Sequence, residues 1–206
     1  MSYLLVHPAR VAALTGAHLA LVAVALAVAF AIALPLGLLL AQRERASVWV
    51  LGVLGAIYTI PSLALLALLV EAVGLGPAPI FIALVAYAQF VLVRNIIAGV
   101  HGVDPAQRDA ALGMGMSPLQ RTWRVVLPQA LPVVIGGVRV AAVAMVALAT
   151  LGGYVGASGL GTLIFMGFTL HHTDEIIAGS IAACILAIII DATLRLLERI
   201  TVSSRA

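Results

Sequence analysis

The sequence predicts an all-α integral membrane protein with five transmembrane helices. Of its 206 residues, 64% are hydrophobic and 9% are charged, and the mean hydropathy is +1.21. A soluble domain needs a polar surface, and this chain has too few polar residues to make one. Five apolar segments are each long enough to cross a bilayer, which takes about 20 residues. A single transmembrane domain over residues 1–206 is therefore expected.

The predicted spans are separated by short polar stretches or by turns rich in glycine and proline. They cover residues 15–41, 48–70, 79–97, 132–151 and 176–197. The first is long enough to tilt, and Pro35 can bend it near its inner end. No cleavable signal peptide is expected, because the apolar run after Arg10 is too long for a signal-peptide core.

The arginines predict how the spans are oriented. All eleven basic residues are arginine. All but Arg10 lie between spans one and two, in or beside the segment between spans three and four, or after span five. The positive-inside rule therefore places the N-terminus outside and the C-terminus inside. The absence of lysine excludes a Walker-type phosphate loop, and the scattered arginines form no continuous face for nucleic acid.

The loop at about residues 99–131 contains two signals for the start of a helix. Asp104-Pro105-Ala106-Gln107 and Ser117-Pro118-Leu119-Gln120 each provide a capping side chain, a proline at the first helical position and a glutamine at the third. A passive connector on the membrane surface is the alternative, but such a connector does not need two caps.

The ends of these two loop helices are also predicted. The first helix should cover residues 105–112, where Gly113 and Gly115 permit a left-handed stop and a sharp turn. The second should cover residues 118–126 and end before Pro128.

This loop resembles the EAA loop of ABC-importer permeases. That motif has Glu-Ala-Ala, three residues, glycine, nine residues and Ile-x-Leu-Pro. Here the pattern is Asp109-Ala110-Ala111, Gly115 and Val125-x-Leu127-Pro128, with Asp for Glu and Val for Ile. With five spans and this length, nearly the whole chain resembles the permease subunit of a type I ABC importer, with the MetI-like fold.

The resemblance implies that the loop, over residues 104–128, docks on a cytoplasmic ATPase with the turn at 112–116 as the contact tip. The implied coupling residues are Asp109, Ala110, Ala111, Leu112, Gly113, Met114, Gly115, Met116, Leu127 and Pro128. It also implies a dimer of ATPases that binds ATP and Mg, a second permease copy or sister permease, and an extracytoplasmic binding protein. The chain itself would bind no cofactor, catalyse no reaction, and lie in the inner membrane of a bacterium or archaeon.

Polar side chains at membrane depth are candidates for the translocation pathway, because burying them in lipid is costly. Pro61 frees a backbone carbonyl in span two, which either a pathway or the hydroxyls beside it could use. Kinking without substrate contact, or a bridge between helices, is the alternative role for these residues. The candidates are Tyr58, Thr59, Pro61, Ser62, Tyr87, Gln89, Thr150 and Tyr154.

Two outer segments leave alternatives open. Residues 152–167 contain six glycines and form either a surface loop or a re-entrant gate. His171, His172, Asp174 and Glu175 cluster in sequence, but without paired ligand spacing no metal site is predicted.

The substrate is suggested by a second resemblance. Thr59-Ile60-Pro61-Ser62-Leu63-Ala64-Leu65, together with a loop ending Leu-Pro-Gln-Ala-Leu-Pro, resembles the osmoprotectant branch of these permeases. That branch carries glycine betaine, choline, carnitine or proline betaine, and tyrosines can contact a quaternary ammonium by cation–π interaction. A methionine or amino-acid importer is the rival, and a passive channel or scaffold is a more distant one. No HExxH or Gly-x-Ser-x-Gly motif is present and no intramembrane histidine is anticipated, so no enzyme is expected.

Overall fold

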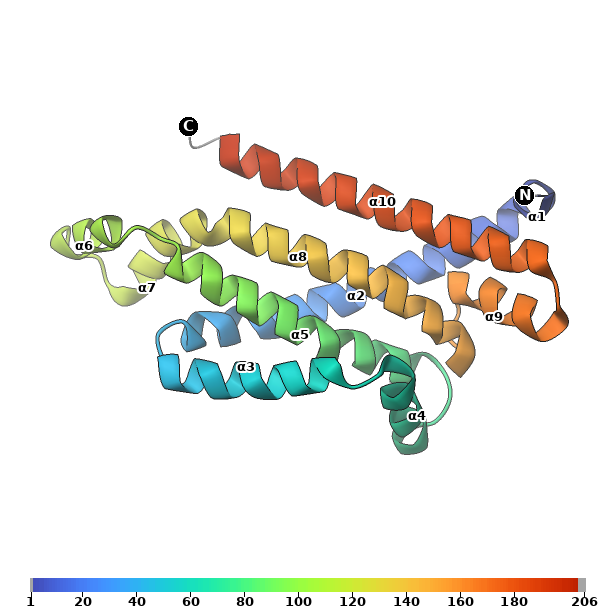
Figure 1. The fold of residues 1–206 in the computed structure, drawn as a ribbon. Coiled ribbons are helices and arrows are strands. Elements are labelled where there is room, and N and C mark those ends of the chain that lie inside the picture. Colours follow the sequence, from blue (N-terminus) through green and yellow to red (C-terminus); the bar gives the residue numbers. More distant parts are fainter. Residues whose placement is uncertain (1, 204–206) are drawn as a thin grey trace.

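The computed structural model describes residues 2–203, and this part of the chain is helical without a β-strand. The helices lie roughly along one axis in a long bundle (Figure 1). The elements are α1 (Ser2–Val6), α2 (Pro8–Leu40), α3 (Glu44–Thr59), α4 (Ser62–Val73), α5 (Pro77–His101), α6 (Pro105–Gly113), α7 (Pro118–Arg121), the π-helical turn η1 (Thr122–Val126), α8 (Leu127–Ala149), the 3₁₀ helix η2 (Thr150–Val155), α9 (Leu160–Leu170) and α10 (Thr173–Ser203).

The connections gather at the two ends of the bundle. The α2–α3 turn, the α6–α7 segment and the end of α10 lie together at one end, and the N-terminus and α9 lie at the other (Figure 1). Four helical stretches are long and apolar enough to cross a membrane: Pro8–Leu40, Pro77–His101, Pro118–Val155 and Thr173–Thr201. The start of α1 and the end of α10 lie at opposite ends, as an odd number of crossings requires.

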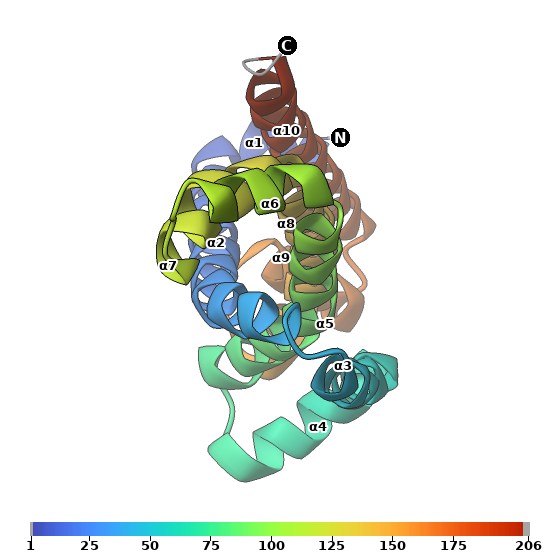
Figure 2. The ribbon, with the colours of Figure 1, turned by 90° about the vertical axis from the view of Figure 1, so that its left-hand side faces the viewer.

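The fifth crossing is broken. Helices α3 and α4 are apolar enough together, but they are bent by 93° at Ile60–Pro61, so the predicted span over 48–70 corresponds to a broken helix pair. Proline has no N–H to continue the helix and disfavours helical backbone in the residue before it. Ile60 is accordingly extended, with φ −62° and ψ 129°, and α4 turns away from the direction of α3 (Figure 2) while still packing against α5.

The core of the bundle is built around α5, which packs against α2, α3, α4 and α8. Ala25, Ala29 and Ala33 of α2 are fully buried and four residues apart, so they lie on one face of the helix. A β-carbon added at Gly37 would lie 2.6 Å from the side chain of Ile96 on α5. Small residues of this kind let transmembrane helices approach closely.

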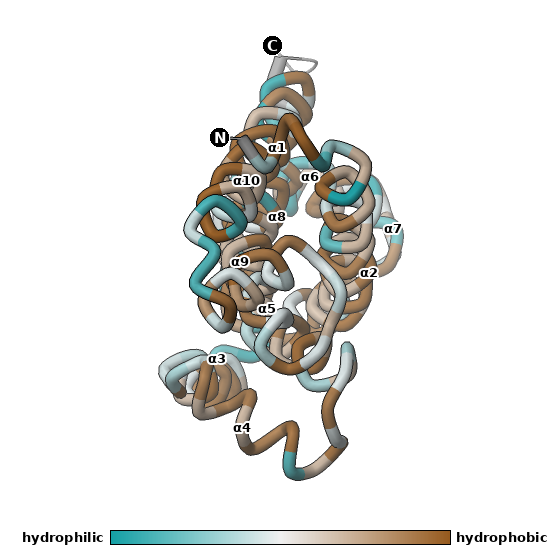
Figure 3. The backbone as a smooth tube through the Cα atoms, turned by 90° about the vertical axis from the view of Figure 1, so that its right-hand side faces the viewer, coloured by the Kyte–Doolittle hydropathy of each residue, from teal (hydrophilic) through white to brown (hydrophobic). Residues whose placement is uncertain are grey.

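Hydrophobic residues predominate along the helices (Figure 3), and many large ones are exposed. Exposed apolar side chains occur on the outer faces of α2, α3 and α10, for example Val24, Trp49 and Ile188. A chain that buries so few of its apolar residues needs a lipid environment, which agrees with the predicted membrane location.

The fourth crossing is continuous with the loop before it. A single helical stretch runs from Pro118 to Val155, so the expectation that the second loop helix ends before Pro128 is wrong. In η1 the backbone widens, and the Leu127 N–H bonds to the carbonyl of Thr122, five residues back. The wider turn lets the helix continue through Pro128, the second residue of α8, without the hydrogen bond that proline cannot donate.

Candidate functional site: an exposed knob and a pocket at the helix break

Residues 104–121, which we call the knob, fold into two short capped helices. The Asp104 carboxylate accepts a hydrogen bond of 2.9 Å from the N–H of Ala106. Ser117 and Gln120 form a reciprocal capping box, with N···O distances of 3.0 and 3.3 Å. Both predicted helix starts are confirmed. The caps satisfy backbone donors that would otherwise be unpaired at the helix ends.

The turn of the knob depends on one glycine. Gly115 has a φ of +72°, a left-handed conformation that glycine adopts without strain. Around it the Gly115 N–H bonds to the carbonyl of Leu112 at 2.9 Å, and the Met116 N–H bonds to that of Ala111 at 3.1 Å. Gly113 does not take part in the predicted left-handed stop, because it is the last residue of α6.

The knob is tied to the ends of the membrane helices. The guanidinium of Arg108 donates to the carbonyl of Val100, in the last turn of α5. The adjacent residue, His101, contacts the carbonyl of Ala41 at the end of α2 with its Nε2 at 2.9 Å. Basic side chains at helix C-termini satisfy free carbonyls and complement the helix dipole. The knob is therefore held to the end of α5 by Arg108 and to α8 by its continuity with that helix, while His101 joins α5 to the end of α2.

The knob exposes apolar side chains. Leu112, Met114 and Leu119 are each more than half exposed, between 53% and 69%, and Trp123, just after the knob in η1, is 53% exposed. Ala110 is exposed but Ala111 is fully buried, so only the first alanine of the motif is open to a partner. Asp109 is also exposed, whereas Leu127 and Pro128 are half-buried in the first turn of α8.

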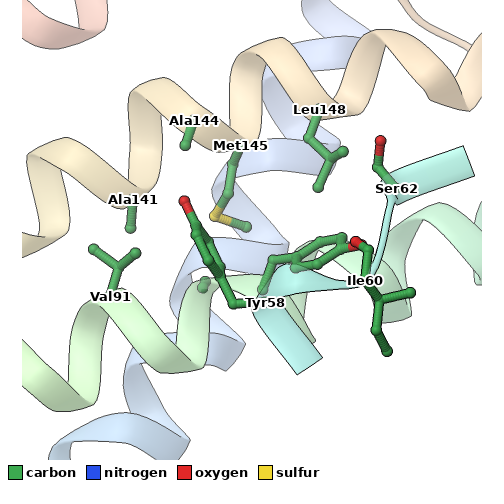
Figure 4. Close-up of a pocket in the computed structure, with 10 residues that line it drawn as sticks. Tyr58, Ile60, Ser62, Val91, Ala141, Ala144, Met145 and Leu148 are labelled. Atoms are coloured by element: carbon green, nitrogen blue, oxygen red, sulfur yellow. The ribbon is translucent and has the colours of Figure 1, made fainter. Parts of the chain in front are cut away.

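A pocket of about 320 Å³ opens at the break between α3 and α4. Figure 4 shows its residues between the α3–α4 break, α5 and α8. Three of the predicted pathway residues meet there: Tyr58, Ser62 and Tyr87. The rest of the lining is Ile60, Ala88, Val91, Ala141, Ala144, Met145 and Leu148.

The aromatic residues at this pocket form a cluster. The ring centroids of Tyr58 and Tyr87 are 5.9 Å apart with an interplanar angle of 87°, and Tyr58 lies 5.3 Å from Phe90. The Tyr87 hydroxyl donates a 2.6 Å hydrogen bond to the carbonyl of Ile60. A carbonyl at the break is thus satisfied by Tyr87, whereas the Thr59 hydroxyl bonds to the carbonyl of Ala56 within its own helix.

The remaining predicted pathway residues lie elsewhere. The Gln89 side-chain amide is buried and donates to the carbonyl of Ala29 at 3.1 Å, so it bridges α5 and α2. The Thr150 hydroxyl bonds to Ala147 in its own helix. Tyr154 is 66% exposed near the other end of the bundle and stacks beside Phe165. The sequence analysis missed the α8 wall of the pocket, because alanines and a methionine in an apolar span carry no polar signal.

The glycine-rich segment 152–167 packs inside the protein. Leu160 and Leu163 are fully buried, and α9 lies against α10 and η2. A β-carbon at Gly161 would lie 1.8 Å from the carbonyl oxygen of Thr150, so the two backbones are in direct contact. This packing excludes a loop that merely lies on the membrane surface, and a gating role stays a prediction.

A histidine inside the first span was missed. His18 is fully buried, and its Nε2 lies 3.1 Å from the carbonyl oxygen of Val146 on α8. A β-carbon at Gly159 would lie 3.0 Å from the His18 Nδ1, so His18 sits where α2, α8 and the start of α9 meet. The expectation of no intramembrane histidine is therefore wrong, although no nucleophile or ligand partner is seen beside it among residues 2–203.

Charged groups form one cluster between α8 and α10. Arg139 lies 3.6 Å from Asp191 and 3.5 Å from Glu198, and Asp191 also pairs with Arg195 at 2.6 Å. The predicted pair of Asp191 and Arg195 is confirmed, but Arg139 joins it instead of only extending toward the membrane surface. His172 and Glu175 pair at 3.5 Å, and in the described part of the chain no three candidate ligands come together for a metal ion.

Comparison with known proteins identifies the family. Residues 33–203 match the family described as binding-protein-dependent transport system inner membrane component. The chain belongs to this family. It is therefore a membrane permease with several spans, and the predicted ABC-permease resemblance is confirmed.

Named relatives of this permease cover most of its length. It is 40% identical over 162 residues to the carnitine transport permease protein OpuCB of Listeria monocytogenes, covering 79% of this chain and 74% of the relative. It is 35% identical over 163 residues to the choline transport system permease protein OpuBB of Bacillus subtilis, with coverages of 79% and 75%. The osmoprotectant import permease protein OsmW of Salmonella typhimurium is 35% identical over 201 residues, covering 95% and 94%.

Solved structures share the fold of this permease. A chain of the MetNI methionine ABC transporter superimposes with a TM-score of 0.81 at 22% identity, covering 90% of this chain and 93% of that one. An amino acid ABC transporter gives a TM-score of 0.73 at 18% identity, with coverages of 95% and 96%. The MetI-like fold is thus confirmed, and at these identities the likeness concerns the fold only.

Proposed function

We propose that this chain is the membrane-spanning subunit of an ATP-driven importer for a small quaternary-amine osmoprotectant. Glycine betaine, choline, carnitine and proline betaine are the candidate solutes. The observation that carries the proposal is the similarity, at 35–40% identity over most of the chain, to permeases named for carnitine, choline and osmoprotectant transport. The tyrosine-lined pocket at the α3–α4 break supports it, because aromatic rings attract quaternary ammonium groups.

The knob is the proposed contact with a cytoplasmic ATPase dimer. Exposed apolar residues on a compact, capped surface favour an interface with another protein. Because α7, η1 and α8 form one continuous helical stretch, a movement of the docked knob would be passed directly to the membrane helix. ATP and Mg would be bound and hydrolysed by the ATPase, and this chain would catalyse no reaction.

The orientation and the other partners follow from the same proposal. The arginine distribution supports a cytoplasmic knob and C-terminus, with the N-terminus and α9 outside. A second permease copy or a sister permease would complete the pathway, and alternating access would arise from rocking of the two subunits. An extracytoplasmic binding protein would deliver the solute at the outer end.

The test is uptake into proteoliposomes that contain this permease and the ATPase encoded beside it, with the corresponding binding protein supplied. Radiolabelled glycine betaine, choline, carnitine and methionine are compared with and without ATP. ATP-dependent uptake of one or more quaternary amines supports the proposal. Uptake of methionine alone would retain the importer and reject the amine, and uptake without nucleotide would indicate a passive channel.

A further inference from the structure

The pocket at the α3–α4 break is lined by apolar and aromatic side chains. None of its ten lining residues is charged, and its polar side chains are the hydroxyls of Tyr58, Ser62 and Tyr87. The Tyr87 hydroxyl already donates to the carbonyl of Ile60. The pocket therefore offers few acceptors for the N–H groups of a primary ammonium, which would be costly to bury unpaired.

A quaternary ammonium avoids this cost because it has no N–H groups. Its positive charge is spread over methyl groups that pack against apolar walls, here Val91, Met145 and Leu148. What such a group needs is an aromatic face within about 6 Å. The lining chemistry thus favours a trimethylammonium group over the ammonium group of an ordinary amino acid.

Tyr58 provides the available aromatic face. It is 44% exposed, whereas Tyr87 is 8% exposed, so much of the Tyr58 side chain is open. Figure 4 places Tyr58 between α5 and α8, beside the pocket. In the same cluster the Phe90 ring already has a cation beside it, because the guanidinium of Arg94 lies 6.0 Å from the ring centre. Tyr58 is then the aromatic residue that can contact a solute.

The dimensions and position of the pocket also fit. Its volume of about 320 Å³ is near the lower end of the range for small-molecule sites, about 300–1,000 Å³. It lies where a broken helix exposes backbone, which at membrane depth is tolerated beside a wet cavity. Tyr58 and Ser62 flank the break in the second predicted span, and Tyr87 is near the middle of α5.

We propose that this pocket holds the trimethylammonium group of the solute during its passage through the permease, with the Tyr58 ring as the main contact. Tyr87 is a positioning residue that fixes the break through the Ile60 carbonyl. The pocket recognises the end that betaine, choline and carnitine share, and leaves the other end of the solute in the open part of the cavity. The proposal depends on the proposed function for the class of solute.

The first arm of the test measures binding to the permease by itself. Saturation-transfer difference NMR is recorded with choline on the permease in nanodiscs of phosphatidylglycerol and phosphatidylethanolamine, which contain no choline headgroup. The variants are Tyr58→Leu, which removes the ring, and Tyr58→Phe, which keeps it. Trp49→Leu is the control, because Trp49 is an aromatic residue of the same helix that is 79% exposed and outside the pocket lining.

We expect Tyr58→Leu to weaken choline binding roughly three- to thirtyfold, the range for a partly desolvated cation–π contact. Tyr58→Phe, which keeps the ring, should bind choline more tightly than Tyr58→Leu, and Trp49→Leu should bind as the unsubstituted chain does. The neutral isostere 3,3-dimethyl-1-butanol, which has carbon in place of nitrogen, should bind more weakly by a similar factor. This comparison needs no variant, so it holds even if Tyr58→Leu folds poorly.

Equal binding of choline by Tyr58→Leu, equal binding of the isostere, or no binding to the unsubstituted chain would each overturn the proposal. Competition by added phosphatidylcholine would assign the pocket to a lipid headgroup and would also overturn the proposal.

The second arm measures ATP-dependent choline uptake by the full complex. Tyr58-dependent binding without uptake would reject the proposed function and retain the pocket, whereas uptake unchanged in Tyr58→Leu would reject the pocket and retain the function.

Discussion

The hydroxyl of Tyr87 on α5 donates a 2.6 Å hydrogen bond to the carbonyl oxygen of Ile60, at the point where α3 and α4 diverge by 93°. Pro61 prevents the helix from continuing, so a carbonyl at the break needs a partner from another helix. Tyr87 supplies it, and so links the bend of the second span to the central helix.

The substitution Tyr87→Phe should therefore destabilise the break while preserving the aromatic packing. The hydrogen bond is part-buried, and losing such a bond costs about 0.5–1.5 kcal/mol. The measurement is the free energy of unfolding in mixed micelles as the fraction of denaturing detergent is raised. Tyr3→Phe is the control. Tyr3 is also a buried tyrosine, but it lies in α1, away from the break, and its ring packs against His7. Equal losses in the two variants would contradict the assigned role of the Tyr87 hydroxyl.

The contact between Gly161 and Thr150 predicts a severe effect of a single methyl group. A β-carbon at Gly161 would lie 1.8 Å from the Thr150 carbonyl oxygen, and this oxygen belongs to backbone that cannot swing away. We expect Gly161→Ala to separate α9 from η2, and folded protein to be lost or greatly reduced. The measurement is the yield of monodisperse protein by size-exclusion chromatography.

Gly16→Ala is the matched control for that substitution. Gly16 lies within α2, and a β-carbon there would meet nothing within 4 Å. Alanine is favoured over glycine in a helix by up to about 1 kcal/mol, so this variant should be as stable as the unsubstituted chain or slightly more so. A normal yield for Gly161→Ala would show that the α9–η2 contact is looser than described.

Features encoded locally could be predicted from the sequence, and those created by packing could not. The caps at Asp104 and Ser117 depend on residues within three positions, so the pattern identified them. Pro61 predicted a kink, but the angle between α3 and α4 depends on how α4 packs against α5 and η2. The π-helical turn before Pro128 had no sequence signal, and it made the loop helix continuous with the fourth span.

The candidate site likewise contains residues that the sequence could identify and residues that it could not. Tyr58, Ser62 and Tyr87 are polar residues in apolar spans, and this contrast was enough to select them. The same contrast also selected Gln89, whose amide instead bridges to Ala29. The sequence could not identify the α8 residues of the pocket, such as Ala144 and Met145, because they line it only through the position of α8.

The Arg139 cluster should contribute little to stability. The side chains of Arg139, Asp191 and Glu198 are about a quarter to a third exposed, and that of Arg195 is 53% exposed, so water screens them. A double-mutant cycle with Arg139→Gln and Glu198→Gln should give a coupling energy of about 0.2–1 kcal/mol that falls as salt is raised. Unfolding in mixed micelles at low and high salt measures it. A coupling well above this range, insensitive to salt, would show that lipid shields the cluster from water.

Gly115 provides a sharp test of the knob as the ATPase contact. Its φ is +72°, yet a β-carbon there would meet no atom within 4 Å, so a side chain at this position points into open space. A left-handed conformation costs a residue other than glycine roughly 1–2 kcal/mol, and asparagine less. Gly115→Asn should therefore keep the turn and most of the activity.

Gly115→Arg adds a long charged side chain to the tip that is proposed to enter the ATPase. We expect membrane insertion and the size-exclusion profile to be unchanged, and ATP-dependent uptake and co-purification of the ATPase to be abolished. Asn carries less of the backbone strain than Arg, so the insertion and size-exclusion measurements on Gly115→Arg are what separate a docking defect from a folding defect. Normal uptake by Gly115→Arg would remove the knob as the coupling element, whereas loss of insertion would show that the turn is needed to fold the chain.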